Sequence, residues 1–203
     1  MINVRNLRPN DDLEKAADLI WQVDPYICPD FFGDRERAKK FGKVLFKDDG
    51  GLFDFGHTLV AEDTEEPGKL IGILIWGDNK TTPWDCEVVK REVERLGIEM
   101  PEQFDRANKD YMEMLVNETR ELPDGVNEVQ WCATDEAARG KGVGTKMFEA
   151  YLALPGYNEQ RLVVLANNPP AIGLYKKMGF EIVSSQTGYP DELVKTHNMV
   201  RKA

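Results

Sequence analysis

The chain has 203 residues, with 26 basic and 36 acidic side chains, a formal net charge of −10 and 41% hydrophobic residues. This apolar content is enough to build a core, so general disorder is excluded. The acidic balance excludes a protein that binds nucleic acid through a basic face, and it favours cationic partners.

The first half of the chain predicts the order strand, helix, helix, strand, strand. Residues 3–7 alternate as a short strand, and apolar residues repeat at helical spacing over 13–23. A second helix is expected over 34–46. Residues 57–62 and 69–76 are predicted to be two strands of a hairpin, because a turn-rich segment joins them.

The second half begins with a charged segment, at about residues 78–124, which we interpret as a two-helix insertion into a single domain of residues 1–203. One of its helices is expected over 85–96. The other starts at Pro101 and carries Phe104, Ala107, Tyr111 and Leu115 on one face. The remaining pattern predicts strands over 127–134, 162–166, 180–184 and 196–200, and helices over 142–154 and 171–178.

The three cysteines, Cys28, Cys86 and Cys132, are too widely spaced for a Cys-x-x-Cys pair, and only two histidines accompany them. We therefore expect neither a zinc site nor a disulfide framework, and no metal. The longest apolar run, 70–76, is far shorter than the roughly 20 residues of a membrane span. The N-terminal residues have no export signal. These features predict a cytoplasmic protein without a nucleic-acid or membrane partner.

A glycine-rich turn, Arg139-Gly140-Lys141-Gly142-Val143-Gly144, lies between a predicted strand and a predicted helix. Glycines let backbone N–H groups approach an anion closely, and the helix that follows adds the positive end of its dipole. The spacing does not fit a P-loop, whose Lys follows the last glycine, nor the Gly-x-Gly-x-x-Gly of a dinucleotide fold. An unliganded turn remains a possible interpretation.

The spacing Arg-x-x-Gly-x-Gly resembles the acetyl-CoA signature of the GCN5-related N-acetyltransferase (GNAT) superfamily. A second block, Asn168-Pro169-Pro170-Ala171 followed by Tyr175 and Gly179-Phe180, is similar to the superfamily's Asn-x-x-Ala block. The resemblance covers most of the chain. It implies an α/β fold with a mixed, strongly twisted sheet of about seven strands and helices on both faces.

The resemblance also implies roles for individual residues in binding acetyl-CoA as the cosubstrate. Cys132 and Thr134 lie where superfamily members hydrogen-bond the pantetheine arm through their backbone. Asn168 matches the Asn whose side chain orients the pantetheine or the acceptor end. The residues that match the pyrophosphate loop are Arg139, Gly140, Lys141, Gly142, Val143, Gly144 and Thr145. An inert, buried Cys132 is an equally good interpretation.

Tyr175 and Glu128 are the candidate catalytic residues. The Tyr175 phenol can protonate the CoA thiolate that leaves, although a core tyrosine would show the same pattern. Glu128 matches a glutamate that takes the amine proton, usually through water, but a solvated Glu at the start of a strand is as good an interpretation. Strand alternation predicts one face shared by Glu128, Gln130, Cys132 and Thr134.

Two departures from the superfamily pattern affect the substrate. The Pro often found before the Arg is replaced by residues 135–138, and the insertion enters directly before the strand that carries Glu128. Residues 85–121 hold eleven acids and six bases, a net charge of −5. They form either a solvated face, which could also pack a homodimer, or an acidic wall that favours a polyamine, aminoglycoside-like or lysine-type acceptor.

The expected reaction is therefore transfer of the acetyl group from acetyl-CoA to a primary amine of a small molecule, peptide or protein, by direct attack in a ternary complex. One alternative is a non-catalytic acyl-CoA-binding sensor or interaction domain, in which the acid and base would be missing. Another alternative keeps the fold but uses a different acyl donor or acceptor.

Overall fold

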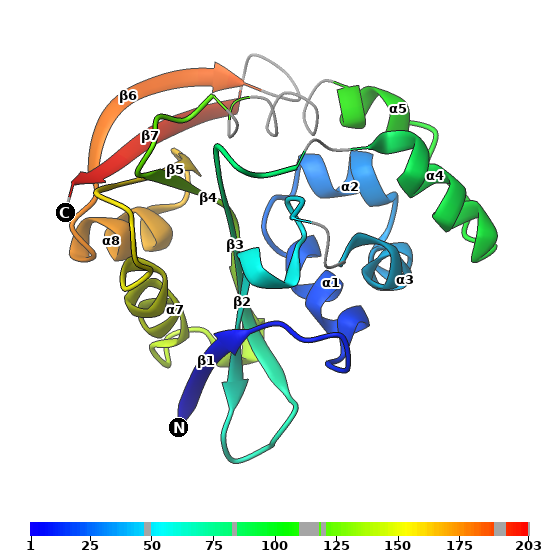
Figure 1. Cartoon of the computed structure of the whole chain (residues 1–203), viewed down its shortest axis with the longest axis horizontal. Coiled ribbons are helices and arrows are strands. Elements are labelled where there is room, and N and C mark those ends of the chain that lie inside the picture. Colours follow the sequence, from blue (N-terminus) through cyan, green and yellow to red (C-terminus); the bar gives the residue numbers. More distant parts are fainter. Residues whose placement is uncertain (47–49, 83–84, 110–117, 119–120, 189–193, 203) are drawn as a thin grey trace.

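The computed structural model describes residues 1–46, 50–82, 85–109, 118, 121–188 and 194–202 (Figure 1). Seven strands form one sheet in the order β1-β2-β3-β4-β5-β7-β6. Only β4 and β5 pair in parallel. This confirms the predicted mixed α/β sheet. The strands are β1 (Ile2–Asn6), β2 (Thr58–Asp63), β3 (Leu70–Asp78), β4 (Val126–Thr134), β5 (Glu159–Leu165), β6 (Glu181–Gly188) and β7 (Val194–Lys202).

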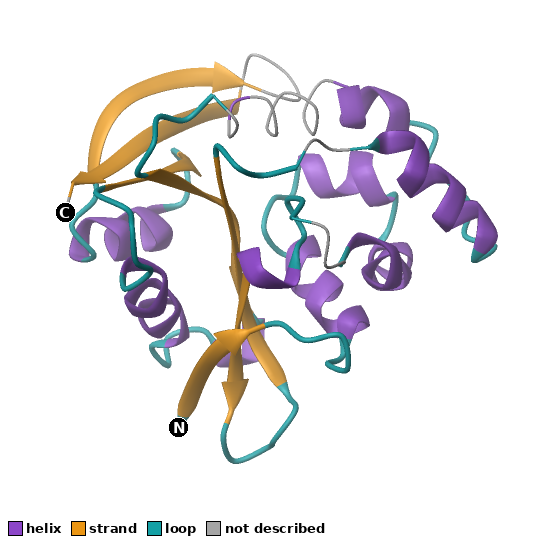
Figure 2. Ribbon diagram, viewed as in Figure 1, coloured by secondary structure: helices purple, strands orange, loops and turns teal. Residues whose placement is uncertain are grey.

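One group of helices lies on one side of the central strands (Figure 2). Their buried residues join the inward side chains of β3 and β4, such as Ile73 and Trp131, in one apolar cluster. Helix α4 contacts α3 and helix α5 contacts α2, so α4 and α5 form an outer layer. These helices are α1 (Leu13–Trp21), α2 (Ile27–Phe32), α3 (Arg35–Leu45), α4 (Cys86–Arg95) and α5 (Phe104–Ala107).

The opposite face is covered by α7 (Val143–Leu152) and α8 (Pro169–Lys177). Phe148 and Tyr175 stack 5.0 Å apart between these helices, and both belong to a second apolar cluster with β3, β4 and β5. The helices on both faces bury β3 completely. A strand buried on both faces reads as a continuous apolar run, which is what its sequence shows.

Three segments differ from the sequence-based expectation. The pattern did not predict α2, which contains Pro29 and is stabilised by aromatic packing: Phe31 lies 4.8 Å from Phe32 and 5.0 Å from Phe104. Strand β5 begins three residues earlier than expected, because polar residues alternate with buried ones from Glu159 onward. In the second insertion helix only α5 is described, and Tyr111 and Leu115 lie outside the described residues.

Candidate active site

Strands β4 and β5 separate along their length. Their parallel pairing runs only from Val126 opposite Glu159 to Val129 opposite Leu162. On its other edge β4 stays paired with β3 as far as Thr134, opposite Gly72. The edge of β4 after Val129 that faces β5 therefore has no strand pairing in the described structure. An extended ligand could bond to this backbone as a strand does.

A β-bulge lies at the point where the two strands separate. Trp76 pairs with Val129, whereas Ile75 pairs with Trp131, so Gln130 is the extra residue on β4. Val129 and Cys132 consequently pack toward α7 and α8, and Trp131 packs toward α1 and α3.

The bulge corrects the expectation of one shared face. Asn127 accepts a hydrogen bond from Tyr151 of α7 at 2.8 Å, so Glu128 points away from α7, to the face opposite Cys132. The prediction that Glu128, Gln130, Cys132 and Thr134 share a face was wrong, because strand alternation does not continue through a bulge.

The glycine loop leads into α7 as the sequence indicates. Gly142 has φ +84° and precedes the helix, and Gly140 has φ +75°. A Cβ on either would meet no atom within 4 Å, whereas a Cβ on Gly144 would lie 2.9 Å from Leu174 of α8. The positive φ values need glycine at the loop, and Gly144 lets α7 and α8 approach closely.

A cavity of about 650 Å³ lies where β4 and β5 separate, between this loop and α8. It contains nine of the ten predicted cofactor residues. These are Cys132, Thr134, Arg139, Gly140, Gly142, Val143, Gly144, Thr145 and Asn168. The exception is Lys141, which lines a separate cavity against β1, β2 and β3. We call the 650 Å³ cavity the donor cavity.

One wall of the donor cavity is formed by residues that no sequence motif predicts. Gln22 and Val23, at the end of α1, line it although they are more than 100 residues away from the glycine loop in sequence. The Gln22 Nε2 donates to the Asp18 carbonyl at 3.3 Å, and its buried Oε1 has no partner among the described residues. A ligand donor in the cavity could satisfy this oxygen. Asn168 caps α8 by accepting from the Ala171 backbone N–H at 3.2 Å.

Tyr175 also lines the donor cavity, beside Cys132. Its side chain is buried, and its hydroxyl makes no hydrogen bond within the described part of the chain, so the O–H is free to donate to a ligand. Burial raises the pKa of Tyr175 above its ordinary value, with a smaller contribution from Cys132. The phenol therefore stays protonated at neutral pH.

The Cys132 thiol is not a nucleophile at neutral pH, since burial raises its pKa to about 12. A covalent acetyl-cysteine would require the thiolate. The inert interpretation of this cysteine therefore holds for its side chain, while its backbone remains on the open edge of β4.

Glu128 lines a groove of about 580 Å³ on the other face of the sheet. Arg161, its partner on β5, bonds Glu159 at 2.7 Å instead. No described side chain forms an ion pair with Glu128. Burial, and then the nearby Glu118, raises the pKa of Glu128 to about 7. We call this the acceptor groove; its other lining residues include Glu121, Leu122, Val163, Val183 and Asn198.

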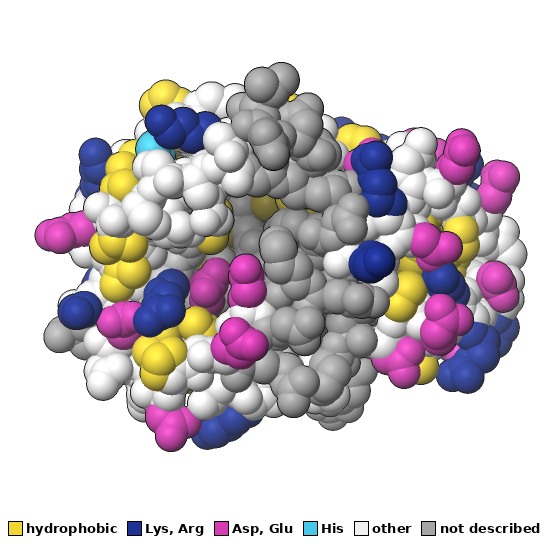
Figure 3. Space-filling view, turned by 90° about the horizontal axis from the view of Figure 1, so that it is seen from above, with side chains coloured by type: hydrophobic (Ala, Val, Ile, Leu, Met, Phe, Trp, Pro, Cys, Tyr) yellow, Lys and Arg dark blue, Asp and Glu magenta, His cyan; other side chains and the backbone are white. Residues whose placement is uncertain are grey.

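The acids of the insertion divide into two groups. Those on α4 and α5 lie in the outer helical layer, where several pair with bases, as Asp105 does with Lys90 and Glu92 with Arg95. Only Glu118 and Glu121, among the described ones, line the acceptor groove. Figure 3 shows acidic side chains gathered beside a hollow on this side of the molecule. The described insertion helices, α4 and α5, therefore lie away from Glu128, whereas Glu118 and Glu121 lie beside it.

The comparisons with known proteins agree with this geometry. Residues 111–182 match the family model described as acetyltransferase (GNAT) domain. An N-acetyltransferase from Staphylococcus aureus Mu50 has the same fold, with TM-score 0.66 and 20% identity over 98% of this chain and 99% of its own. No curated protein sequence matches the chain.

Two further solved structures share the fold at 14% identity. The NatC complex bound to Gag peptide and CoA gives TM-score 0.58 and covers 100% of this chain and 98% of the other. The ribosomal-protein-S18-alanine N-acetyltransferase from Escherichia coli gives 0.56, with 100% and 94% covered. Residues 111–182 thus match the GNAT domain model, and the chain has the fold of these N-acetyltransferases, which confirms the resemblance that its two motifs predict.

Within the described ranges no helix is long and apolar enough to cross a membrane. The same residues contain no group of three or more side chains suited to hold a metal ion.

Glu128 gives a pH prediction with two readouts. With an acceptor amine of low pKa, kcat/KM should rise with pH through about 7 and then level off, as the carboxylate becomes able to take a proton. Glu128→Gln should remove this limb.

The same group makes folding stability depend on pH. The pKa of Glu128 is higher in the folded than in the unfolded protein, so the free energy of unfolding falls as the pH rises from the unfolded pKa to about 7. The Gln variant should therefore be more stable than the parent at pH 8 but not at pH 4. A wild-type rate that is flat from pH 5 to 9 would exclude Glu128 as the base.

Proposed function

We propose that the protein transfers the acetyl group of acetyl-CoA to a primary amine by direct attack in a ternary complex. One observation carries the proposal: Tyr175 and the glycine loop line a cavity beside the later part of β4, and Glu128, near the start of the same strand, lines a second cavity. A donor in the first cavity and an acceptor in the second would both lie against the strand that parts from β5 after Val129.

The donor cavity suits acetyl-CoA in three ways. The glycine loop and the N-terminus of α7 offer backbone N–H groups and a positive dipole end to the pyrophosphate. The part of β4 around Cys132, beyond its ladder with β5, offers backbone hydrogen bonds to the amides of the pantetheine arm. In the proposed complex, a backbone N–H of this part of β4 would polarise the thioester carbonyl.

The proposed reaction exchanges a C–S bond for a C–N bond and removes two protons from the acceptor nitrogen. Glu128 takes the first proton from the acceptor ammonium, directly or through water, and the free amine attacks the thioester carbon. The new C–N bond forms as the C–S bond breaks, and the nitrogen then releases its second proton to water, which gives the neutral amide. Tyr175 donates its hydroxyl hydrogen to the departing sulfur, giving CoA thiol, and the phenolate regains a proton from solvent. Because its raised pKa makes full proton transfer uphill, much of the effect of Tyr175 would come from its hydrogen bond to the developing thiolate.

The main alternative is a domain that binds acyl-CoA without catalysis. Such a domain would not need an acid and a base, yet Tyr175 and Glu128 are both present, and each lines one of the two cavities. Release of CoA thiol from acetyl-CoA with a panel of primary amines, measured against an amine-free control, separates the two. Tight acetyl-CoA binding without amine-dependent release would favour the alternative.

The charges in the acceptor groove favour an acceptor amine that carries no carboxylate. Burial and then Glu121 raise the pKa of Glu118, burial and then Glu118 raise the pKa of Glu128, and the neighbouring Arg161 is already paired with Glu159. Exposed Val163 and Val183 add an apolar surface to the groove. We infer that the acceptor is a cationic amine on an uncharged, partly apolar body.

The acceptor preference predicts a charge effect on one substrate only. Reversal of Glu118 and Glu121 to Lys should raise KM for hexylamine about tenfold or more, and further at low salt, while KM for acetyl-CoA stays the same. In the wild type, 6-aminohexanoate, which has a similar chain with a carboxylate, should be the poorer acceptor.

Reversal of Glu94 and Glu102 is the matched control. Both are exposed residues in or beside the outer helices, away from the groove, and this pair changes the net charge equally. An equal rise in amine KM for both double variants would assign the effect to the overall charge of the protein and contradict recognition in the groove.

A further inference from the structure

A network of ion pairs lies next to the residues that lead into the glycine loop, and it consists of Lys15, Asp18, Arg35 and Asp135. Asp18 of α1 is only 3% exposed, and it accepts hydrogen bonds from Arg35 Nε at 2.5 Å and from Lys15 Nζ at 3.1 Å. Lys15 Nζ also contacts Asp135 Oδ2 at 2.5 Å. Two bases and two acids thus cancel in charge and join α1 and α3 to the residue that follows β4.

Asp135 determines how the chain enters the loop. Its Oδ1 accepts from the Ala137 backbone N–H at 3.0 Å and caps a single 3-10 turn, Glu136–Ala138. Its own N–H donates to the Ile71 carbonyl at 2.9 Å, which fixes the turn to β3. Arg139, the first residue of the loop, follows directly. Asp135 therefore holds the turn that leads into the glycine loop.

A carboxylate here is electrostatically unfavourable for the ligand of the loop. Asp135 is four residues before Arg139 and lines the far side of the same turn. The hydrogen bond from Lys15 holds the pKa of Asp135 below its ordinary value, so the carboxylate is charged at neutral pH. A pyrophosphate bound to the loop would be repelled by this charge unless a cation neutralised it.

We propose that Lys15 is a positioning residue of the donor site, which neutralises Asp135 so that the glycine loop can hold the pyrophosphate of CoA. The inference rests on the proposed function, because it takes CoA as the ligand of this loop. Asp18 and Arg35 act through Lys15: Asp18 holds the ammonium toward Asp135, and Arg35 balances the charge of Asp18.

A purely structural role for the same ion pairs makes a different prediction. If the set only fastened α1 to the sheet, its loss would lower stability and weaken every ligand of the donor cavity alike. If Lys15 compensates a charge, the loss should depend on the phosphates of the ligand and on the charge of Asp135.

The test is a double-mutant cycle on Lys15 and Asp135, with CoA affinity measured by calorimetry. Lys15→Met should weaken CoA binding about tenfold or more, and high salt should reduce that loss. Asp135→Asn, which can still cap the turn, should have little effect, and the double variant should recover most of the lost affinity. Lys15→Arg should retain the affinity of the parent.

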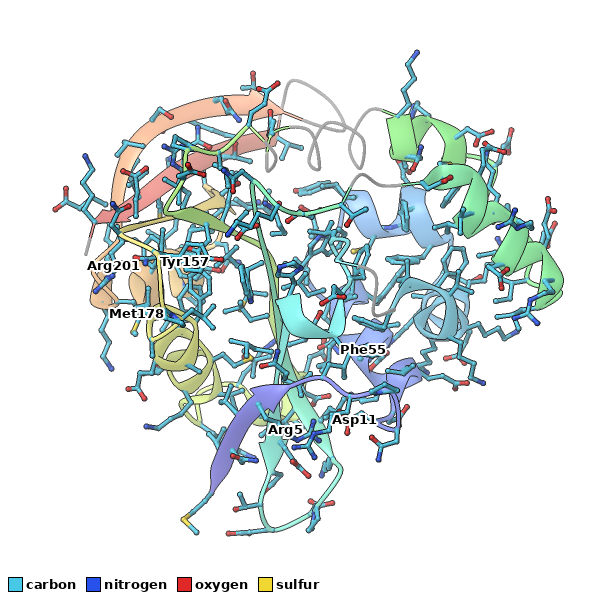
Figure 4. All side chains as sticks on the ribbon, viewed as in Figure 1. Arg5, Asp11, Phe55, Tyr157, Met178 and Arg201 are labelled. Atoms are coloured by element: carbon cyan, nitrogen blue, oxygen red, sulfur yellow. The ribbon has the colours of Figure 1, made fainter. Side chains whose placement is uncertain are left out.

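Two comparisons separate charge compensation from stability. KM for S-acetylpantetheine, which carries the thioester arm but no phosphate, should be unchanged in Lys15→Met. Arg5→Met is the matched control: Arg5 bonds Asp11 and Glu62 in a similar half-buried set on β1 (Figure 4), so its loss should lower Tm but not CoA affinity.

The outcomes are distinguishable. A wild-type protein that fails to bind CoA would contradict the proposed function, and the role of Lys15 with it. If the wild type binds CoA, unchanged affinity in Lys15→Met would contradict the role of Lys15 alone. The same conclusion would follow if the double variant bound CoA as weakly as the single one, or if S-acetylpantetheine were affected equally.

Discussion

Tyr175→Phe should lower kcat about 10²-fold or more, with little change in acetyl-CoA affinity. The substitution removes only the hydroxyl, so the ring keeps its packing against Phe148 and Phe180. The thiolate then leaves without a proton or a hydrogen bond from the protein. Steady-state kinetics at neutral pH, together with CoA affinity by calorimetry, provide the measurement.

Tyr151→Phe is the control for this substitution. This substitution also removes the hydroxyl of a buried tyrosine. The Tyr151 hydroxyl donates to Asn127 and does not line the donor cavity. We expect a loss of stability of about 1 kcal/mol and a retained kcat. If Tyr175→Phe turned over at the parent rate, another group or water would have to protonate the sulfur, and Tyr175 would be a core residue only.

Gly142→Asp should weaken CoA binding by about 10²-fold or more while leaving the fold intact. A carboxylate would then stand at the start of α7, where the pyrophosphate is expected, and no protein atom lies within 4 Å of its Cβ to be displaced. The backbone there has φ +84°, which adds strain for a side chain of about 1–2 kcal/mol.

Two variants separate charge from strain at Gly142. Gly142→Asn has nearly the same shape as the Asp variant and tolerates positive φ, so it should bind CoA much better. Gly156→Asp introduces the same charge and strain at φ +92° in an exposed turn, and should affect stability alone. Equal CoA affinity in Gly142→Asp and the parent would contradict the pyrophosphate loop.

The sequence by itself predicted much of the donor side. Residues 139–144 and 168–180 are contiguous motifs whose chemistry is local: glycines at positive φ, a helix N-terminus and an Asn cap. Local hydrophobic periodicity also predicted all seven strands and most helices. It did not predict α2, since Phe31 and Phe32 are held by aromatic contacts with α3 and α5.

What only the tertiary structure decided depends on contacts between distant segments. The bulge at Gln130 arises from pairing with β3, and it turns Glu128 to the face opposite Cys132. Lys141 lies in a motif yet points into a different cavity, because the side-chain directions of a tight turn are not set by its spacing. Gln22 reaches the donor cavity, and Lys15 reaches Asp135, through the packing of α1 against the sheet. Motifs record which residues can bind a ligand, whereas long-range packing and strand register decide which of them face the same space.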